Sequence, residues 1–190
     1  MKGLYTGWGR ITVCGWLWVA AGIGIGLLPP SHKANAFMGQ KAPEITSPAW
    51  INSEPLSLKA LRGKVVLVEF WTFGCYNCRN VEPQIKEWHQ RYVDEGLVVI
   101  GVHSPEFNYE KNIEAVKRYV RDKSIVYPTA IDNNFIIWNR FGNRYWPAIY
   151  LIDKQGVIRY SRFGEGGYAQ TEQVIQTLLA GSPLKGDKND

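Results

Sequence analysis

The chain has 190 residues, 45% of them hydrophobic and 21% charged, a composition that is typical of one globular domain and excludes a disordered chain or a coiled coil. Beyond residue 36, 19 basic and 17 acidic residues leave a net charge of +2, which is not the signature of a nucleic-acid-binding protein. Three cysteines are too few for the disulfide framework of a small secreted domain.

An uncharged stretch over residues 11–28 follows Arg10, and the small-residue triplet Ala34-Asn35-Ala36 lies shortly after it. The 18 residues of this stretch are longer than most signal-peptide cores and shorter than most membrane-spanning helices. The segment is therefore either a signal peptide cleaved after Ala36 or a retained anchor that contacts the membrane through residues 11–28. Both interpretations place the rest of the chain outside the cytoplasm. We expect residues 1–36 to be the signal or anchor, 37–183 one domain and 184–190 a polar tail.

Two apolar stretches, residues 65–71 (VVLVEFW) and 97–103 (LVVIGVH), have the length and β-branched composition of strands buried on both faces. Between them, apolar residues recur at spacings of four, three and four from Val81 to Tyr92, which predicts an amphipathic helix over residues 75–95. A short connection through one helix makes two strands parallel, so these elements form a right-handed βαβ unit.

Outside residues 65–103, the sequence pattern predicts an irregular N-terminal segment, three helices and a β-hairpin. Residues 37–55 are expected to be irregular or a short hairpin, and residues 55–61 a short strand and a turn of helix. Helices are expected over residues 110–122, 134–141 and 168–180, and an Asp-Lys-Gln-Gly turn joins strands 148–153 and 157–163. This order is that of the α/β thioredoxin-like fold, a mixed central sheet of four strands with helices on both faces.

Cys75 and Cys78 form a Cys-x-x-Cys motif where the first strand gives way to the long helix. Unpaired N–H groups and the helix dipole stabilise a thiolate at a helix N-terminus, so Cys75 is the predicted nucleophile. Cys78, almost one turn later, is placed to resolve the mixed disulfide. A zinc site needs four ligands, and the scattered histidines do not complete one around the two cysteines. Covalent attachment of haem needs a His directly after the second cysteine, where this chain has Arg79. Redox exchange without metal or cofactor is favoured over these sites and over a structural disulfide.

Glu69 is the only charged residue in the strand of residues 65–71, six positions before Cys75. In a strand covered on both faces a carboxyl has a raised pKa and can exchange a proton with Cys78. The alternative is an acid that leans toward solvent at a sheet edge. We favour the proton-transfer role because a charge in a covered strand is costly without one.

Trp146-Pro147 directly precedes the strand of residues 148–153. Proline is tolerated at the first residue of a strand for ordinary steric reasons. On the thioredoxin-like fold, a cis proline at this point faces the cysteine pair and leaves the backbone of the preceding residue free to pair with an extended substrate. We therefore expect a cis Trp146–Pro147 bond, Pro147 to act with the catalytic residues, and Trp146 to bind substrate.

The segments GKVVLVEFWTFGCYNC, LVVIGVHSPEF and YWPAIYLID, with a helix that contains Pro83 after the first, resemble the extracytoplasmic thioredoxin-like proteins of the TlpA-like group. Within it, they are most similar to the C-terminal domain of DipZ-type transporters, over residues 42–178. The resemblance implies a thiol-disulfide oxidoreductase in which Cys75 attacks, Cys78 resolves, Glu69 is the buried acid and Pro147 the cis-proline. It implies exported thiol or disulfide proteins and a membrane or soluble electron donor as partners, in some cases for cytochrome c maturation.

The chain departs from the TlpA-like pattern beside its cysteines, where Gly74 replaces the usual Trp and Tyr-Asn replaces a Gly-Pro-like pair. The intervening pair helps to set the reduction potential, so the direction of electron flow stays open; reduction of exported disulfides is favoured, since no feature marks a strong oxidant. Thr72-x-x-Cys75 suggests a thiol peroxidase of the peroxiredoxin kind, although Val68 stands where such enzymes need Pro. A binding module without catalysis is the other alternative, and the intact cysteines argue against it.

Overall fold

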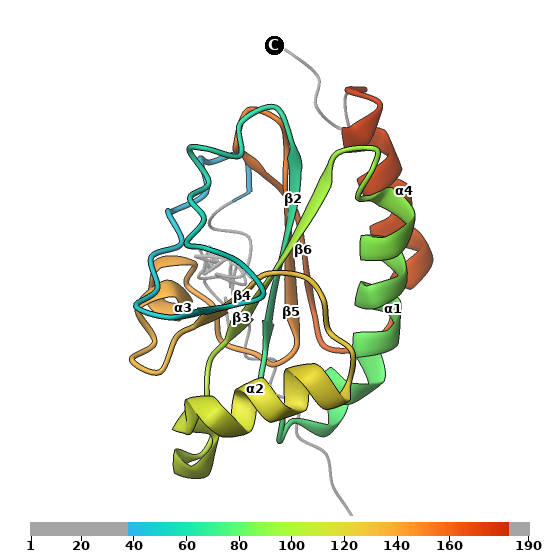
Figure 1. Ribbon diagram of the computed structural model, residues 1–190. Helices are drawn as coiled ribbons and strands as arrows, with labels where there is room; N and C mark the ends of the chain where they lie inside the picture. The colour runs from blue at the N-terminus through green and yellow to red at the C-terminus, as the bar shows by residue number, and fades with distance from the viewer. Residues whose placement is uncertain (1–37, 183–190) are drawn as a thin grey trace, which may run out of the picture. The chain divides into compact units, whose positions relative to one another are not determined.

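The computed structural model describes residues 38–182, all of which belong to one compact unit (Figure 1). A mixed six-stranded sheet has the spatial order β1-β4-β3-β2-β5-β6. The strands are β1 (Trp50–Ile51), β2 (Val65–Trp71), β3 (Leu97–His103), β4 (Thr129–Ile131), β5 (Ala148–Ile152) and β6 (Ile158–Phe163). The helices are α1 (Tyr76–Tyr92), the 3₁₀ helix η2 (Asn108–Lys111), α2 (Ile113–Asp122), α3 (Ile136–Arg140) and α4 (Tyr168–Leu179).

β2 lies inside the sheet, and all seven of its residues are buried. It pairs in parallel with β3, with Val65 opposite Leu97 and Trp71 opposite His103, and antiparallel with β5. The predicted βαβ unit is therefore confirmed. Because β2 and β3 end in register, the start of α1 and the loop after β3 meet at one edge of the sheet, where sites gather in folds with parallel strands.

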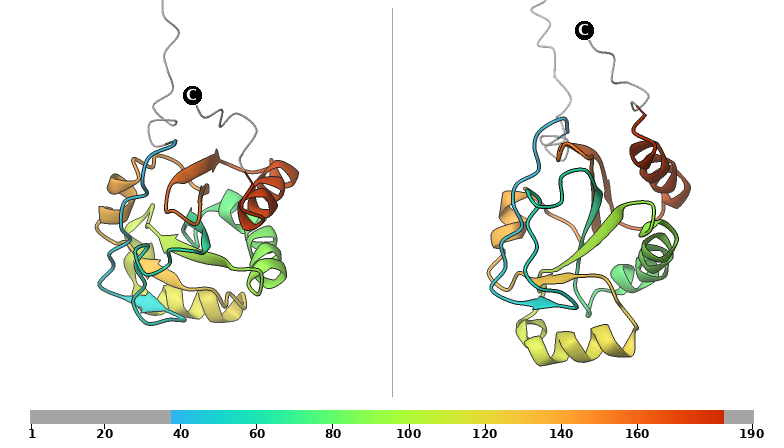
Figure 2. Two further views of the ribbon diagram at one scale, coloured as in Figure 1. Left: turned by 90° about the horizontal axis from the view of Figure 1, so that it is seen from above. Right: turned by 45° about the horizontal axis from the view of Figure 1, so that its top comes forward.

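The side chains of β2 alternate between two apolar layers, as the pleat of a strand requires. Leu67 and Trp71 pack in one layer with residues of α1, α2 and α4. Val66 and Phe70 pack in the other layer with residues of α3. Figure 1 shows α1 and α4 together on one side of the sheet and α3 on the opposite side, and both views of Figure 2 agree. The thioredoxin-like arrangement with helices on both faces is confirmed.

The prediction of four strands is wrong in number, because two short strands extend the sheet. β4 pairs in parallel with β3, and β1 pairs antiparallel with β4 at the edge. Residues 55–61 form neither a strand nor an α-helix. The side chain of Glu44 accepts the backbone N–H groups of Leu58 at 2.8 Å and Lys59 at 2.9 Å, so a carboxylate satisfies donors that a regular element would otherwise pair.

Two of the predicted helices begin later than expected. The Asn112 side chain accepts a hydrogen bond from Ala115 N–H at 3.1 Å and caps α2, which therefore starts at Ile113, while Glu110 belongs to η2. α3 is limited to Ile136–Arg140. The hairpin of β5 and β6 and the terminal helix α4 agree with the prediction within two residues.

The predicted signal peptide or anchor of residues 1–36 and the tail of residues 184–190 lie outside the described residues. Between residues 38 and 182, no helix combines the length and the apolar character needed to cross a membrane.

Candidate active site

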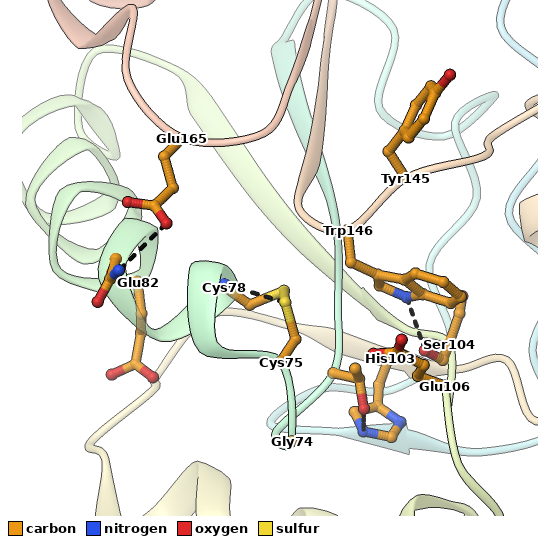
Figure 3. The surroundings of a disulfide bond; sticks show 12 residues. Gly74, Cys75, Cys78, Glu82, His103, Ser104, Glu106, Tyr145, Trp146 and Glu165 are labelled. Carbon is orange, nitrogen blue, oxygen red and sulfur yellow. Dashed lines mark hydrogen bonds between the residues drawn. A yellow bond between two sulfur atoms is a disulfide. The ribbon is translucent and has the colours of Figure 1, made fainter.

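Cys75 and Cys78 lie where β2 passes into α1 and are joined by a disulfide (Figure 3). Cys75 is the N-cap residue of α1, and its Sγ accepts a hydrogen bond from Cys78 N–H at 3.1 Å. The first turn of α1 contains no acidic residue. The donor at the sulfur and the positive end of the helix both stabilise a negative charge on Cys75. Cys75 is also the more exposed cysteine, at 9% against 3% for Cys78, as an attacking residue must be.

Glu69 lies in the middle of β2, between Gly101 of β3 and Ile149 of β5, and is 2% exposed. The sheet-edge alternative is therefore wrong. Alternation along the strand puts Glu69 on the same face as Leu67 and Trp71, which is the face covered by α1 and the cysteine pair. Burial raises the pKa of Glu69 from 4.5 to about 8. A carboxyl with this pKa is mostly protonated at neutral pH and can act as a proton donor.

Tyr127 bonds to Glu69 directly, and Glu82 acts on Glu69 through its charge. Tyr127 Oη donates to Glu69 Oε2 at 3.3 Å and lowers the pKa of Glu69, whereas the charge of Glu82 raises it. Glu82 itself is buried on α1, where it accepts hydrogen bonds from Tyr119 Oη at 2.8 Å and Lys86 Nζ at 3.0 Å. The sequence pattern does not mark Tyr127 or Glu82 as site residues. The one available signal was the position of Glu82, one helical turn after Cys78.

The Trp146–Pro147 bond is cis, as predicted. The indole Nε1 of Trp146 donates to Ser104 O at 2.9 Å, and its ring lies 4.1 Å from that of Trp138, centroid to centroid. These contacts fix the indole beside the disulfide (Figure 3). The structure thus brings Trp146 and Cys75 into one site, although they are far apart in the sequence.

An open depression of about 290 Å³ lies over Cys75 and is lined by Gly74, Cys75, Tyr76, Asn77, Glu106, Phe107 and Trp146. Its walls come from the start of α1, the loop after β3 and the segment before β5. A larger hollow of about 640 Å³, between residues 46–48 and the segment around α3, contains none of the predicted site residues. We place the site at the smaller depression because Cys75 lines it, whereas no cysteine lines the larger hollow.

His103, at the end of β3, is fully buried, and its Nε2 lies 3.2 Å from Thr72 Oγ1. Burial lowers the pKa of His103 from 6.5 to about 4, so the imidazole is neutral at neutral pH and adds no positive charge to the site. The part of the chain that the structure describes holds no cluster of three His, Cys, Asp or Glu residues able to bind a metal ion.

The AhpC/TSA family model matches residues 38–161 of the chain. The chain belongs to this family. Protein DipZ of Mycobacterium tuberculosis is 47% identical over 133 residues, which are 68% of this chain and 19% of DipZ. The chain thus spans about a fifth of the length of the DipZ proteins that it matches, and the predicted resemblance to them is confirmed.

Smaller proteins match over nearly their whole length. Thiol-disulfide oxidoreductase YkuV of Bacillus subtilis is 30% identical over 142 residues, which are 74% of this chain and 95% of YkuV. The solution structure of a thioredoxin-like protein in the oxidized form superimposes with a TM-score of 0.68 at 31% identity, over 76% of this chain and 97% of that one. A thiol-disulfide isomerase from Corynebacterium glutamicum gives a TM-score of 0.65 at 29% identity, over 73% and 97%.

Proposed function

We propose that this protein is a thiol-disulfide oxidoreductase that works through Cys75 and Cys78. The observation that carries the proposal is a disulfide at the N-terminus of α1, on the face of the sheet that also holds a buried carboxyl, Glu69, with a pKa of about 8. The similarity to YkuV, over nearly all of its length, supports the same activity.

In the reducing direction, the Cys75 thiolate attacks one sulfur of a substrate disulfide. The substrate S–S bond breaks, the released sulfur takes up a proton, and Cys75 forms a mixed disulfide with the other sulfur. Cys78 then loses its proton and attacks Cys75 Sγ, which releases the second substrate thiol and forms the Cys75–Cys78 disulfide. Two electrons pass from the dithiol to the substrate, and the protein must be reduced again by a thiol donor.

Glu69 handles the proton of Cys78 in both directions. When a donor thiolate attacks Cys75 of the oxidised protein, Cys78 leaves as a thiolate and needs a proton, which the protonated Glu69 supplies. When Cys78 must attack, the ionised Glu69 accepts that proton. A group that works both ways needs a pKa near the working pH, and burial in β2 gives Glu69 such a value.

Substrate binding involves the backbone of Trp146 beside the disulfide. Among residues 38–182, no backbone hydrogen bond outside the regular elements involves Trp146, whereas Pro147 O accepts one from Gly164 N–H at 2.9 Å. An extended substrate segment pairs with the free groups of Trp146 while its sulfur lies over Cys75. Pro147 sets the direction of this segment, which joins the site to β5.

The protein acts outside the cytoplasm as a reductase of disulfides in exported proteins, cytochrome c precursors among them, and receives electrons from a membrane-bound or soluble thiol protein. The apolar stretch of residues 11–28, with Lys2 and Arg10 before it, supports export or membrane anchoring. We propose the reducing direction because a strong oxidant needs a strongly stabilised reduced form, and the residues around Cys75 and Cys78 in the sequence carry no marker of one.

The test is reduction of insulin by the full chain with dithiothreitol as donor. We expect turnover by the wild type, none by Cys75→Ser, and a stable mixed disulfide of Cys78→Ser with protein substrates that mass spectrometry can identify. Glu69→Gln should slow the resolving step roughly a hundredfold, with Glu54→Gln, which removes an exposed acid, as the control. Wild-type turnover by Cys75→Ser would end the proposal, and wild-type turnover by Glu69→Gln between pH 6 and 8 would end the proton-transfer role.

Peroxide reduction is the competing activity. It is suggested by Thr72, which stands three residues before Cys75 in this member of the AhpC/TSA family. The fully buried Thr72 lies with its hydroxyl at hydrogen-bond distance from His103, which favours a structural role for it. Consumption of hydrogen peroxide by Cys78→Ser at a rate above that of insulin reduction by the wild type would support the peroxidase instead.

A further inference from the structure

Glu110 of η2 is a carboxylate with 0% exposure that the proposed chemistry does not use. Its Oε1 accepts the N–H of Gly74 at 2.9 Å, and its Oε2 accepts the N–H of Phe107 at 2.8 Å and that of Glu106 at 2.5 Å. No cation among residues 38–182 forms a salt bridge with Glu110. Three backbone donors and no acceptor around one carboxyl suit its ionised form, which can only accept hydrogen bonds.

The bonds of Glu110 join the two walls of the depression over Cys75. Gly74 belongs to the turn that precedes Cys75, while Glu106 and Phe107 belong to the loop after β3, and all three residues line the depression. Figure 3 shows Gly74 at the foot of the turn that leads to the disulfide. The carboxylate therefore fixes both the nucleophile's turn and the loop opposite it.

Glycine at position 74 leaves room for the Glu110 carboxylate beside the backbone. A Cβ atom on Gly74 would overlap Glu110 Oε1 and the hydroxyl of Tyr109. A side chain at this position would displace Glu110 Oε1 from the Gly74 N–H, so Gly74, which departs from the TlpA-like pattern, fits the observed position of the acid.

We propose that Glu110 is a positioning residue that also makes the cysteine pair a stronger reductant, an inference that rests on the proposed thiol-disulfide activity. The Glu110 carboxylate is bonded to the N–H of Gly74, the residue before Cys75. A negative charge at this place disfavours the Cys75 thiolate and opposes the stabilisation that the start of α1 provides. The thiolate exists only in the reduced form of the cysteine pair. A group that destabilises the thiolate therefore shifts the equilibrium toward the Cys75–Cys78 disulfide and makes the pair a stronger reductant. This adds a physical cause to the reducing direction.

Other charged or titratable groups also lie around Cys75, and the test has to separate them from Glu110. Burial keeps the pKa of His103 at about 4 and that of Glu69 at about 8, so neither changes charge appreciably between pH 5 and 7. Glu106 lines the same depression but is exposed, and makes a matched control. The other groups are Tyr76 and Arg79 at the start of α1, Glu82 further along it, Tyr109 of η2, and Glu165, which binds Asn80.

The experiment measures iodoacetamide alkylation of Cys75 against pH in the full chain carrying Cys78→Ser, with Glu110→Gln and Glu106→Gln compared. We expect Glu110→Gln to lower the pKa of the Cys75 thiol by about one unit. Because a thiolate of lower pKa is also less nucleophilic, a tenfold gain in thiolate below the pKa gives about a threefold faster reaction. Glu106→Gln, whose charge is screened by solvent, should change the rate much less. With both cysteines present, Glu110→Gln should shift the glutathione redox equilibrium toward the dithiol.

An unchanged or raised Cys75 pKa in a folded Glu110→Gln protein would overturn the inference, as would an equal effect of Glu106→Gln. Near-UV circular dichroism checks the fold of each variant. Should Glu110→Gln not fold, amide exchange in the oxidised wild type decides: the Gly74 N–H should be protected although it lies in a turn, and rapid exchange would refute the positioning role. Neither alkylation nor amide exchange requires turnover. Insulin reduction by Cys75→Ser would therefore contradict the proposed function without bearing on the role of Glu110.

Discussion

Replacing Glu69 by Gln should change how the stability of the folded protein depends on pH. The folded-state pKa of Glu69 is about 8, against an ordinary 4.5, because the side chain is buried. Between these two pH values the unfolded chain releases the proton and the folded protein keeps it. The stability that Glu69 contributes is therefore complete below pH 4.5 and is lost as the pH rises to 8, by about 1.4 kcal/mol per unit.

His103 has the opposite slope. Its folded-state pKa is about 4, against an ordinary 6.5, so the unfolded chain takes up a proton first and stability falls as the pH drops from 6.5 to 4. The slopes of Glu69 and His103 cancel between pH 4.5 and 6.5. From pH 6.5 to 8 Glu69 acts alone, and the wild type should lose about 2 kcal/mol over these 1.5 units.

Urea unfolding of the oxidised proteins, followed by tryptophan fluorescence at pH 4.5, 6.5 and 8, measures this directly. Between pH 6.5 and 8 the Glu69→Gln protein should hold its stability while the wild type loses about 2 kcal/mol, and between 6.5 and 4.5 the variant should lose about 3 kcal/mol through His103. Glu54→Gln, which removes an exposed acid, should follow the wild type. Parallel curves for wild type and Glu69→Gln above pH 6.5 would refute the reasoning.

Three other predictions concern the cysteine pair, the hydrogen bond of Glu69 and the start of α3. Alkylation of the single-cysteine proteins should give a Cys75 pKa well below the ordinary value of about 8.5 and a Cys78 pKa that is not lowered; equal values would contradict the assigned roles. Tyr127→Phe removes the hydrogen bond that lowers the pKa of Glu69, so the loss of stability in urea should extend to higher pH, and a shift to lower pH would speak against it. Asp132→Asn replaces a carboxylate that accepts two backbone N–H groups at the start of α3, at 3.0 and 2.9 Å. The change should cost about 1–2 kcal/mol in unfolding free energy, and no loss would contradict a stabilising role of these two bonds.

The parts of the fold that the sequence predicted are those with strong local patterns. β2 and β3 are unbroken apolar runs, α1 has a regular apolar face, and the hairpin is marked by its turn. The position of Cys75 at the junction of β2 and α1 follows from these patterns alone. β4 has three residues, too few to show alternation, and β1 has two, so only their pairing with a longer strand reveals them.

The polar contacts of the site could not be predicted because they are non-local. Gly74 and Glu110 are 36 positions apart, and Glu69 and Tyr127 are 58 positions apart. Glu110 stands in a polar stretch that looks solvent-exposed in the sequence. The one local sign of its role is glycine at position 74, where the TlpA-like pattern has Trp; the sequence alone does not show what takes up that space.

Two buried carboxyls beside one cysteine pair have different uses because their hydrogen bonds differ. Glu69 receives a single bond, from a phenol at 3.3 Å, which is too little to offset burial, and it keeps its proton to about pH 8. Glu110 receives three backbone N–H bonds, the pattern that suits a fixed negative charge. Burial by itself favours the protonated form of both carboxyls. The number of backbone donors is the physical basis on which we propose Glu69 as the source of protons for Cys78 and Glu110 as the positioning carboxylate near Cys75.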